Sequence, residues 1–273
     1  MVPRLAQTRH SRRPPSPLTG LGPTVKTEPE GGSPVRLGRR SWAVERFVGS
    51  AAEFHARPMP EPVDRRLWVL EVDRPALVLG SSQADDLVDL GRAAAAGIEV
   101  VRRRSGGGAV LLMPREVLWV DVLLPAADPL WDPDVGRSAW WLGEAWTRAL
   151  RRVGSLGRGS ELRAEVHHGP MIHTAWSSLA CFAGVGPGEV VSGPTSGAPR
   201  SQGGSGKLVG ISQRRTRAGA RFQCALYEDH DPAALPELLA LDAASRSTLT
   251  AVLGAAVATA ELDADDLLAA LPG

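Results

Sequence analysis

Continuous or alternating apolar runs along the chain predict several strands. The segments "LWVLEV" and "VLWVDVLLP" are rich in β-branched and aromatic residues, which suit a pleated backbone. The turn "DRP" separates two such runs, and "TRAG" joins the last two into an expected hairpin. The expected strands are residues 67–72, 76–82, 98–105, 117–125, 207–215 and 220–228, with a short one at 189–191.

Apolar residues spaced three or four positions apart predict helices between these strands. The pattern is clearest at 132–154, where Asp134 is an expected N-cap and Gly154 an expected stop. The apolar stripe of this helix is Val135, Ala139, Leu142, Trp146, Ala149 and Val153, and we expect its Trp residues in the core. Further helices are expected at 41–57, 83–97, 232–242 and 247–260.

Strands and helices are mixed without strict alternation, which favours an α+β (mixed α/β) fold over a doubly wound sheet. Residues 1–40 are rich in Pro, Gly and Ser and show no periodicity. Such a segment buries too little apolar surface to offset its ordering entropy. We therefore expect a disordered extension at 1–40 and one folded domain at 41–273, and removal of residues 1–38 should leave stability and activity nearly unchanged.

The charge, the cysteine count and the length of the apolar runs limit the kinds of partner and the cellular location that we expect. The 273 residues are 43% hydrophobic and 22% charged with a net charge of +1, so no global charge favours nucleic acid or a membrane surface. Two cysteines, Cys181 and Cys224, form no disulfide framework and suit a reducing cytoplasm. No apolar run is long enough to span a bilayer, and no signal-peptide core follows the N-terminus. We expect a cytoplasmic protein.

Three common kinds of site fit the sequence poorly. The segment "GGSGK" resembles the end of a phosphate-binding P-loop, but Leu208 stands where the Ser or Thr that holds magnesium is required. His167, His168 and His173 lack a carboxylate or cysteine at metal-ligand spacing, so we interpret them as loop or core residues and expect no metal site. A nucleophile elbow, G-x-S-x-G between strand and helix, does not occur.

The stretch "RRRSGGGAV", residues 102–110, carries a stronger signal. Three consecutive glycines weaken a strand and therefore need a reason. Glycine lets backbone N–H groups approach a ligand closely and form an anion-binding concavity. The neighbouring Arg and Ser supply further donors to a phosphate or carboxylate. The stretch predicts a binding site for an acidic group.

Lys207 is a second unusual residue. The chain contains 31 Lys and Arg residues, yet only Lys26 and Lys207 are lysines. A lysine ammonium is a compact point charge, whereas the guanidinium is planar and larger. A chain that otherwise uses Arg for positive charge is expected to keep Lys where this difference matters.

Taken together, three motifs resemble the lipoate-protein ligase A family. "RRRSGGGAV" resembles the Arg-Arg-x-Ser-Gly-Gly-Gly-Ala-Val signature that lines the lipoyl-adenylate site, "GKLVGISQ" resembles the lysine-containing second signature, and "LVLGSSQ" resembles an early strand with its turn. Their order and spacing match over about residues 41–230. The resemblance implies the fold of biotin and lipoate ligases, a central mixed β-sheet with helices packed outside it.

The resemblance also implies roles for individual residues. Arg103 and Ser105 fall on ligand-contacting positions, and Lys207 falls on the lysine that lies against the acyl carbonyl and phosphate. The other positions carried over are the backbone cradle Gly106, Gly107, Gly108 and Ala109, and Gly210 and Ser212 in the second motif.

Two features favour a related branch, the cysteine-dependent octanoyltransferases. Cys181 in "ACFAG" precedes Lys207 as a Cys-Phe pair does in that branch, and only about forty-five residues follow "ALYE", so we do not expect the large accessory domain of many ligases. Leu111, Leu112 and Met113 replace the aromatic-His-Asp stretch of the ligases, and Glu116 or a neighbour replaces an Asn. Cys181 is thus either a nucleophile or a buried small hydrophobe, and Cys224 is expected in the core.

The resemblance therefore implies one of three activities. The first is a ligase that uses ATP and Mg²⁺ to attach lipoate through lipoyl-AMP. The second is an ATP-independent transferase that moves an octanoyl group from acyl carrier protein through a Cys181 thioester. The third is a degenerate, non-enzymatic relative that binds lipoate or a carrier protein. For the enzymes, the implied acceptor is a lipoyl carrier domain of the 2-oxoacid dehydrogenase E2 or glycine cleavage H protein type.

Overall fold

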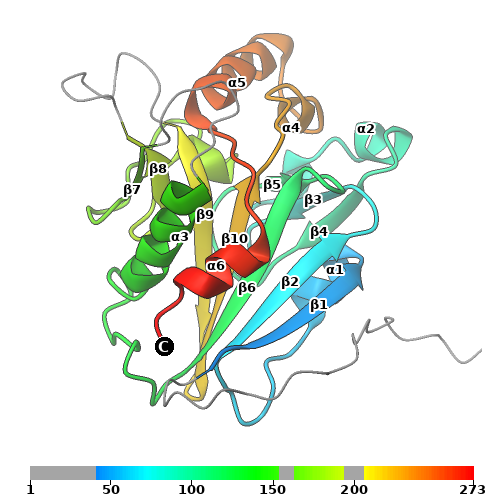
Figure 1. Ribbon diagram of the computed structural model, residues 1–273. Helices are drawn as coiled ribbons and strands as arrows, with labels where there is room; N and C mark the ends of the chain where they lie inside the picture. Colours follow the sequence, from blue (N-terminus) through cyan, green and yellow to red (C-terminus); the bar gives the residue numbers. More distant parts are fainter. Residues whose placement is uncertain (1–40, 154–162, 194–205) are drawn as a thin grey trace, which may run out of the picture.

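A seven-stranded mixed sheet forms the centre of the molecule (Figure 1). The computed structural model describes residues 41–153, 163–193 and 206–273. The first two strands of the sheet run parallel, and every other neighbouring pair in it is antiparallel. In spatial order the strands are β1 (Ala43–Gly49), β2 (Arg66–Val72), β6 (Val117–Pro125), β10 (Gly219–Tyr227), β9 (Lys207–Arg215), β8 (Val190–Ser192) and β7 (Ala164–Val166).

A smaller sheet packs against one face of the large one. Its strands, in spatial order, are β4 (Glu99–Arg102), β3 (Ala76–Leu79) and β5 (Val110–Leu112). β3 is parallel to β4 and antiparallel to β5. Phe47 and Trp68 of the large sheet share a buried apolar cluster with Val78 and Leu112 of the small one, so apolar packing joins the two sheets.

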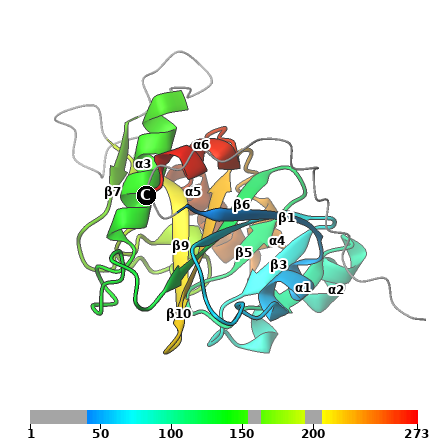
Figure 2. The same cartoon turned by 60° about the horizontal axis from the view of Figure 1, so that its bottom comes forward.

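Helices α3 (Trp140–Val153) and α6 (Ala264–Ala270) cover the opposite face of the large sheet. Figure 2 shows these helices on one side of β6 and β1, with α1, α2 and β3 on the other. Val120 and Val122 of β6 pack in the cluster of α3 and α6, while Trp119 and Leu123 pack toward the small sheet. β6 is buried on both faces, which explains its nearly continuous apolar sequence.

The remaining helices are short or lie at the end of the small sheet. They are α1 (Ala51–Ala56), α2 (Leu90–Ala95), α4 (Ala234–Glu237), α5 (Ala243–Ala256) and the 3₁₀ turns Asp85–Leu87 and Cys181–Ala183. Residues of α2, α4 and α5 form a third apolar cluster with Leu77 and Ala180. Within the described ranges, none of the helices has the length and apolar character needed to cross a bilayer.

The expected fold class, α+β with a central mixed sheet and packed helices, is confirmed. The bounds of β6 and β9 coincide with the predicted strands, and β9 pairs with β10 as the predicted hairpin. Trp146 is fully buried in the core, as predicted, whereas Trp140 and Trp141 are half-buried. Val135 and Val153, the two ends of the predicted apolar stripe, are exposed, so the stripe is correct only in its middle. Residues 1–40 lie outside the described residues, so their predicted disorder stays a prediction.

The helix predicted at 41–57 is wrong. The segment forms β1 and then the short helix α1, because Ser50 and Glu53 make a capping box that starts a helix only after the strand. The apolar spacing that suggested one helix places Val48 on an exposed position 49% accessible to solvent. β1 is an edge strand parallel to β2, and this long-range pairing decides its conformation.

Other helices begin later or are shorter than predicted. The segment 83–97 forms a 3₁₀ turn and then α2, which Asp89 caps. Asp134 does not cap α3: its side chain accepts a hydrogen bond from Gly136 N, and the helix begins at Trp140. Only four residues of 232–242 are helical. The elements β5, β7 and α6 were not predicted from the sequence.

Candidate active site

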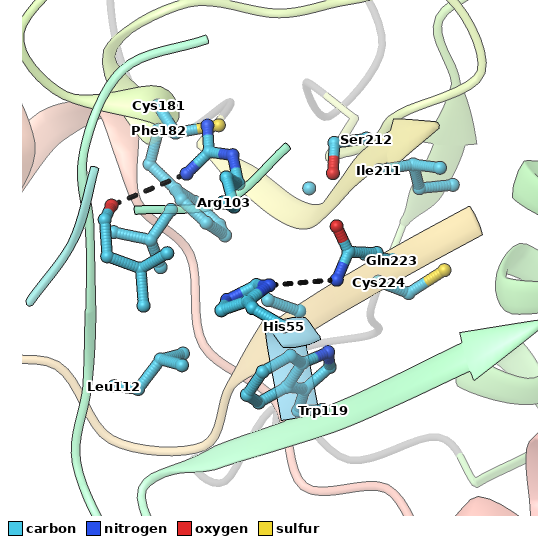
Figure 3. Close-up of a pocket in the computed structure, with 14 residues that line it drawn as sticks. His55, Arg103, Leu112, Trp119, Cys181, Phe182, Ile211, Ser212, Gln223 and Cys224 are labelled. Carbon is cyan, nitrogen blue, oxygen red and sulfur yellow. Dashed lines mark hydrogen bonds between the residues drawn. The ribbon is translucent and has the colours of Figure 1, made fainter. Parts of the chain in front are cut away.

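A pocket opens between the two sheets beside the glycine-rich stretch. Its walls come from α1, β3, β5, β6, β9, β10 and the 3₁₀ turn at Cys181, and the space free of protein atoms inside it and at its mouth is about 460 Å³. Figure 3 shows Cys181 and Arg103 at one end, Leu112 and Trp119 at the other, and His55 between them.

The glycine-rich stretch is fixed to the Cys181 turn by main-chain contacts. Ala109 N donates to Leu179 O at 2.8 Å, and Cys181 N donates to Ala109 O at 3.0 Å. A Cβ on Gly108 would lie 2.5 Å from the carbonyl carbon of Ala180, so only glycine allows this approach. The contact holds the predicted cradle against the turn that carries Cys181.

Gly107 and Gly80 make a second close approach. Gly107 has a φ of +97°, a backbone conformation that favours glycine at this position. Its carbonyl oxygen would lie 1.9 Å from a Cβ on Gly80, so position 80 also requires glycine. Gly106 differs, since a Cβ there would meet nothing within 4 Å. Two of the three glycines therefore have a structural reason that needs no ligand.

Arg103 organises the glycine-rich stretch from inside. The side chain is buried, and Nη2 donates to Gly106 O and Gly108 O at 2.8 Å each. A Cβ on Gly107 would lie 3.0 Å from this Nη2 and 3.9 Å from Cys181 Sγ, so the two groups flank the same glycine. Burial lowers the pKa of Arg103, and the adjacent Cys181 side chain opposes that lowering. The guanidinium is thus placed to stabilise negative charge on the sulfur.

Lys207 is buried in an ion pair. Nζ donates to Glu189 Oε2 at 2.9 Å and to the Cys181 carbonyl oxygen at 2.7 Å, and it lies 4.9 Å from the Phe182 ring centre. Glu189 also accepts from Gly186 N through Oε2 and from Ile211 N through Oε1, so both carboxylate oxygens are hydrogen-bonded. The ammonium holds the backbone of the Cys181 turn, and it does not line the pocket.

Ser105 and Ser212 meet at the side of the pocket. Their hydroxyl oxygens lie 3.1 Å apart, and Ser105 Oγ donates to Gln223 Oε1 at 3.4 Å. Ser212, Gly210 and Gln223 line the pocket, whereas Ser105 lies behind them and is buried. The first and second motifs, separated by about a hundred residues, are therefore in direct contact.

His55 is a pocket residue that the sequence did not indicate. Its ring lies 4.9 Å from the Trp119 ring, and Nδ1 lies 3.2 Å from Gln223 Nε2. Burial, with the nearby charges of Arg221 and Arg103, lowers the pKa of His55 to about 3, so the imidazole is neutral. Among the described residues, nothing accepts a hydrogen bond from Nε2, which is buried.

The structure brings most of the predicted site together. Arg103, Cys181, Gly210 and Ser212 line one pocket, with Ser105, Ala109 and the three glycines directly behind it. Cys224 is fully buried, as predicted, and burial raises the pKa of its thiol. Glu189, His55 and Gln223 were missed. The only sequence signal for Glu189 was its position as a carboxylate residue in a loop rich in Gly and Pro.

The histidines near residue 170 take the loop and core positions predicted for them. His167 is buried, and its ring bonds to the Pro170 carbonyl oxygen at 2.7 Å, while His168 and His173 are exposed. Across residues 41–153, 163–193 and 206–273, no three His, Cys, Asp or Glu side chains gather as a metal site would require.

Comparison with known proteins places these features in a family. The family model of the lipoyl protein ligase A/B catalytic domain matches residues 40–261. A search of curated protein sequences finds no match.

Solved structures share the fold at low sequence identity. A bipartite lipoate protein ligase system from Thermoplasma acidophilum, described with its E2 lipoyl domain, is 17% identical over 84% of this chain and 80% of that one, with a TM-score of 0.59. A lipoate-protein ligase A bound with ATP is 18% identical over 85% and 82%, with a TM-score of 0.54. A further T. acidophilum protein, solved with bound lipoic acid, is 20% identical over 80% and 73%, with a TM-score of 0.51.

Proposed function

Because the chain belongs to the lipoyl protein ligase A/B catalytic-domain family, we propose that it attaches a lipoyl or octanoyl group to a lysine of a lipoyl carrier domain. We further propose that the acyl group passes through a thioester on Cys181. The observation that carries this choice is the position of Cys181: its side chain lines the pocket beside the buried Arg103 guanidinium. A thiol next to a fixed positive charge has the environment of a reactive cysteine.

The proposed reaction has two acyl transfers. The Cys181 thiolate attacks the carbonyl carbon of an acyl thioester, forming an enzyme thioester and releasing the donor thiol as its thiolate. The amine of the acceptor lysine then attacks the enzyme thioester. An amide bond forms, Cys181 leaves as thiolate, and the proton lost by the amine passes to solvent or to the departing sulfur. No ATP is consumed, because the donor thioester supplies the energy of the amide bond.

Two cations have separate tasks in this scheme. Arg103 stabilises the charge on the sulfur before attack and after departure. Lys207 holds the carbonyl of Cys181 and is itself neutralised by Glu189, so it fixes the position of the nucleophile. The glycine-rich backbone next to Cys181 would accommodate the acyl carbonyl, as the predicted cradle requires.

The second candidate is a ligase that forms lipoyl-AMP from lipoate, ATP and Mg²⁺. It is supported by family membership and by the shared fold with a ligase bound with ATP. In this route Lys207 would have to contact the carboxylate or acyl phosphate, and therefore leave Glu189, with which it is paired at 2.9 Å. The geometry favours the thioester route for this reason. A non-enzymatic lipoate-binding or carrier-binding protein is the third candidate.

The acceptor is proposed to be a lipoyl domain of the E2 or H-protein type, and the donor of the thioester route an acyl carrier protein. The T. acidophilum ligase that shares the fold is described with its E2 lipoyl domain.

One experiment separates the three candidates. The protein is incubated with a lipoyl domain and either octanoyl carrier protein without ATP or lipoate with ATP and Mg²⁺, and both proteins are weighed by intact mass spectrometry. We expect an acyl adduct on Cys181 and acylated domain from the carrier thioester, both lost in Cys181→Ser. Acylation that needs ATP and survives Cys181→Ser would establish the ligase. Lipoate or carrier binding without any acylation would establish the third candidate.

A further inference from the structure

One side of the pocket is built around a single hydrogen-bond donor. The pocket wall near His55 is otherwise apolar, with Val78, Val110, Leu112 and Trp119. Figure 3 shows the His55 ring in this part of the pocket, joined through one nitrogen to Gln223 and well separated from Cys181. The other nitrogen, Nε2, is buried, and no group in the described part of the chain accepts from it.

Gln223 determines which nitrogen of His55 carries the proton. Its amide Oε1 accepts from Ser105 Oγ at 3.4 Å. The other amide atom, Nε2, carries only donors and lies 3.2 Å from His55 Nδ1. Because this NH₂ donates to Nδ1, the neutral imidazole has its proton on Nε2.

A buried ion pair holds the whole arrangement in place. Arg221 Nε donates to Asp121 Oδ2 at 2.6 Å, and its two Nη atoms donate to Phe54 O and Arg57 O at 2.8 Å each. These carbonyls end the helix that carries His55. Trp119, on which the imidazole packs, donates to Asp121 Oδ1 at 2.8 Å. The contacts with Trp119 and Gln223, and the anchored end of the helix, fix the position of the imidazole ring.

A chain that fills the pocket must either accept from this N–H or leave it unpaired in an apolar site, which is costly. We propose that His55 is a specificity-determining residue that favours an acyl chain with a hydrogen-bond acceptor along its length over a plain alkyl chain. For the two acyl groups of the proposed function, on which this inference rests, the acceptor is a sulfur of the lipoyl dithiolane ring. Octanoyl has none. Gln223 is a positioning residue that acts through His55.

The test uses free lipoic acid and octanoic acid as probes of the pocket, with the full chain and isothermal titration calorimetry. We expect the wild type to bind lipoate more tightly. In His55→Phe, which keeps an aromatic ring on Trp119 but lacks the donor, the ratio of the two dissociation constants should fall about threefold to tenfold. His55→Gln restores an N–H near the Nε2 position and should retain the preference.

Two further measurements separate a donor from a structural role. Leu112→Met changes the same pocket without changing its polarity and should move both affinities together. In ¹⁵N-labelled wild type, the imidazole spectrum should show the Nε2–H tautomer, and its resonance should shift with lipoate and not with octanoate. An equal ratio in wild type and His55→Phe, or the Nδ1–H tautomer, would overturn the inference and leave the proposed function intact. Binding of neither acid by the wild type would also overturn the inference, because a pocket that holds neither chain cannot select between them. The proposed function is tested separately by acylation from the carrier thioester.

Discussion

The Lys207 ammonium and the Glu189 carboxylate form a buried ion pair, 2.9 Å apart with 1% and 6% of their side chains exposed. Removal of one partner leaves an uncompensated buried charge, which costs about 3–5 kcal/mol. We expect Lys207→Met and Glu189→Gln each to lower the free energy of unfolding by about this amount. The double variant should lose much less than the sum of the two. Urea denaturation measures all four proteins, and strictly additive losses would contradict the pair.

Lys207→Arg tests the need for a compact charge. The guanidinium is larger and directs its donors differently, so it cannot replace both short bonds of a side chain that is 1% exposed. Turnover should fall about 10²-fold, the usual cost of misplacing a reacting group by about 1 Å, because Lys207 fixes the turn that carries Cys181. The control is Lys26→Arg at the other lysine, in the segment predicted to be disordered. Equal acylation rates for both variants and the wild type would remove Lys207 from the site.

The glycines offer a matched pair of substitutions. A methyl group on Gly108 meets the Ala180 and Cys181 backbone at 2.5–2.7 Å, whereas one on Gly106 meets nothing within 4 Å. Gly108→Ala should therefore displace the Cys181 turn and abolish acylation, and Gly106→Ala should keep most of the activity. Gly107→Val should also fail, because a φ of +97° strains a β-branched residue. The rate of lipoyl-domain acylation is measured for each variant. Equal rates for Gly106→Ala and Gly108→Ala would contradict the close main-chain contact inferred at Gly108.

The two cysteines should differ in reactivity. Cys181 is partly accessible and lies beside Arg103, while Cys224 is fully buried and has a pKa raised by that burial. Iodoacetamide should alkylate Cys181 in the native protein and leave Cys224 unmodified, since thiolate is the reactive form. Peptide mass mapping identifies the modified residue. Denatured protein, in which both should react, is the control, and native labelling of Cys224 would contradict the structure.

His55 should make stability depend on pH. Its pKa is about 3 in the folded state and about 6.5 when unfolded, so only the unfolded state binds the proton between these values. Stability should fall as pH drops from about 6.5 toward 3, by up to about 1.4 kcal/mol per pH unit. His55→Phe removes this contribution. The test compares urea midpoints of both proteins from pH 7 to pH 4, and parallel curves would contradict the low pKa.

The sequence predicted correctly those elements whose conformation follows from the apolar pattern of their own residues. β6 is a nine-residue run rich in valine and leucine, and the sequence allowed only a buried strand there. The segment 41–57 misled, because its apolar spacing suits a helix and only pairing with β2 decides for a strand. That error also hid His55, whose helix begins at Ala51, ten residues later than predicted.

For the candidate site, too, residues within motifs were predicted, and residues whose role depends on distant contacts were not. The glycines, Arg103, Cys181 and Lys207 were visible as motifs, and the structure brings them together. Glu189 was not visible, because its role depends on a lysine 18 residues away that reaches it only across paired strands. The three glycines were correctly interpreted as needing a reason, but for Gly108 that reason is a main-chain contact with Ala180.

The bonds that join the glycine-rich stretch to the Cys181 turn use only main-chain atoms of Ala109, Leu179 and Cys181. None of these bonds uses the side chain at position 181. On the proposed thioester route, a single codon change at this position would remove the reactive group, while the main-chain bonds of the turn could still form. In evolutionary terms, the covalent step would then be gained or lost by one substitution.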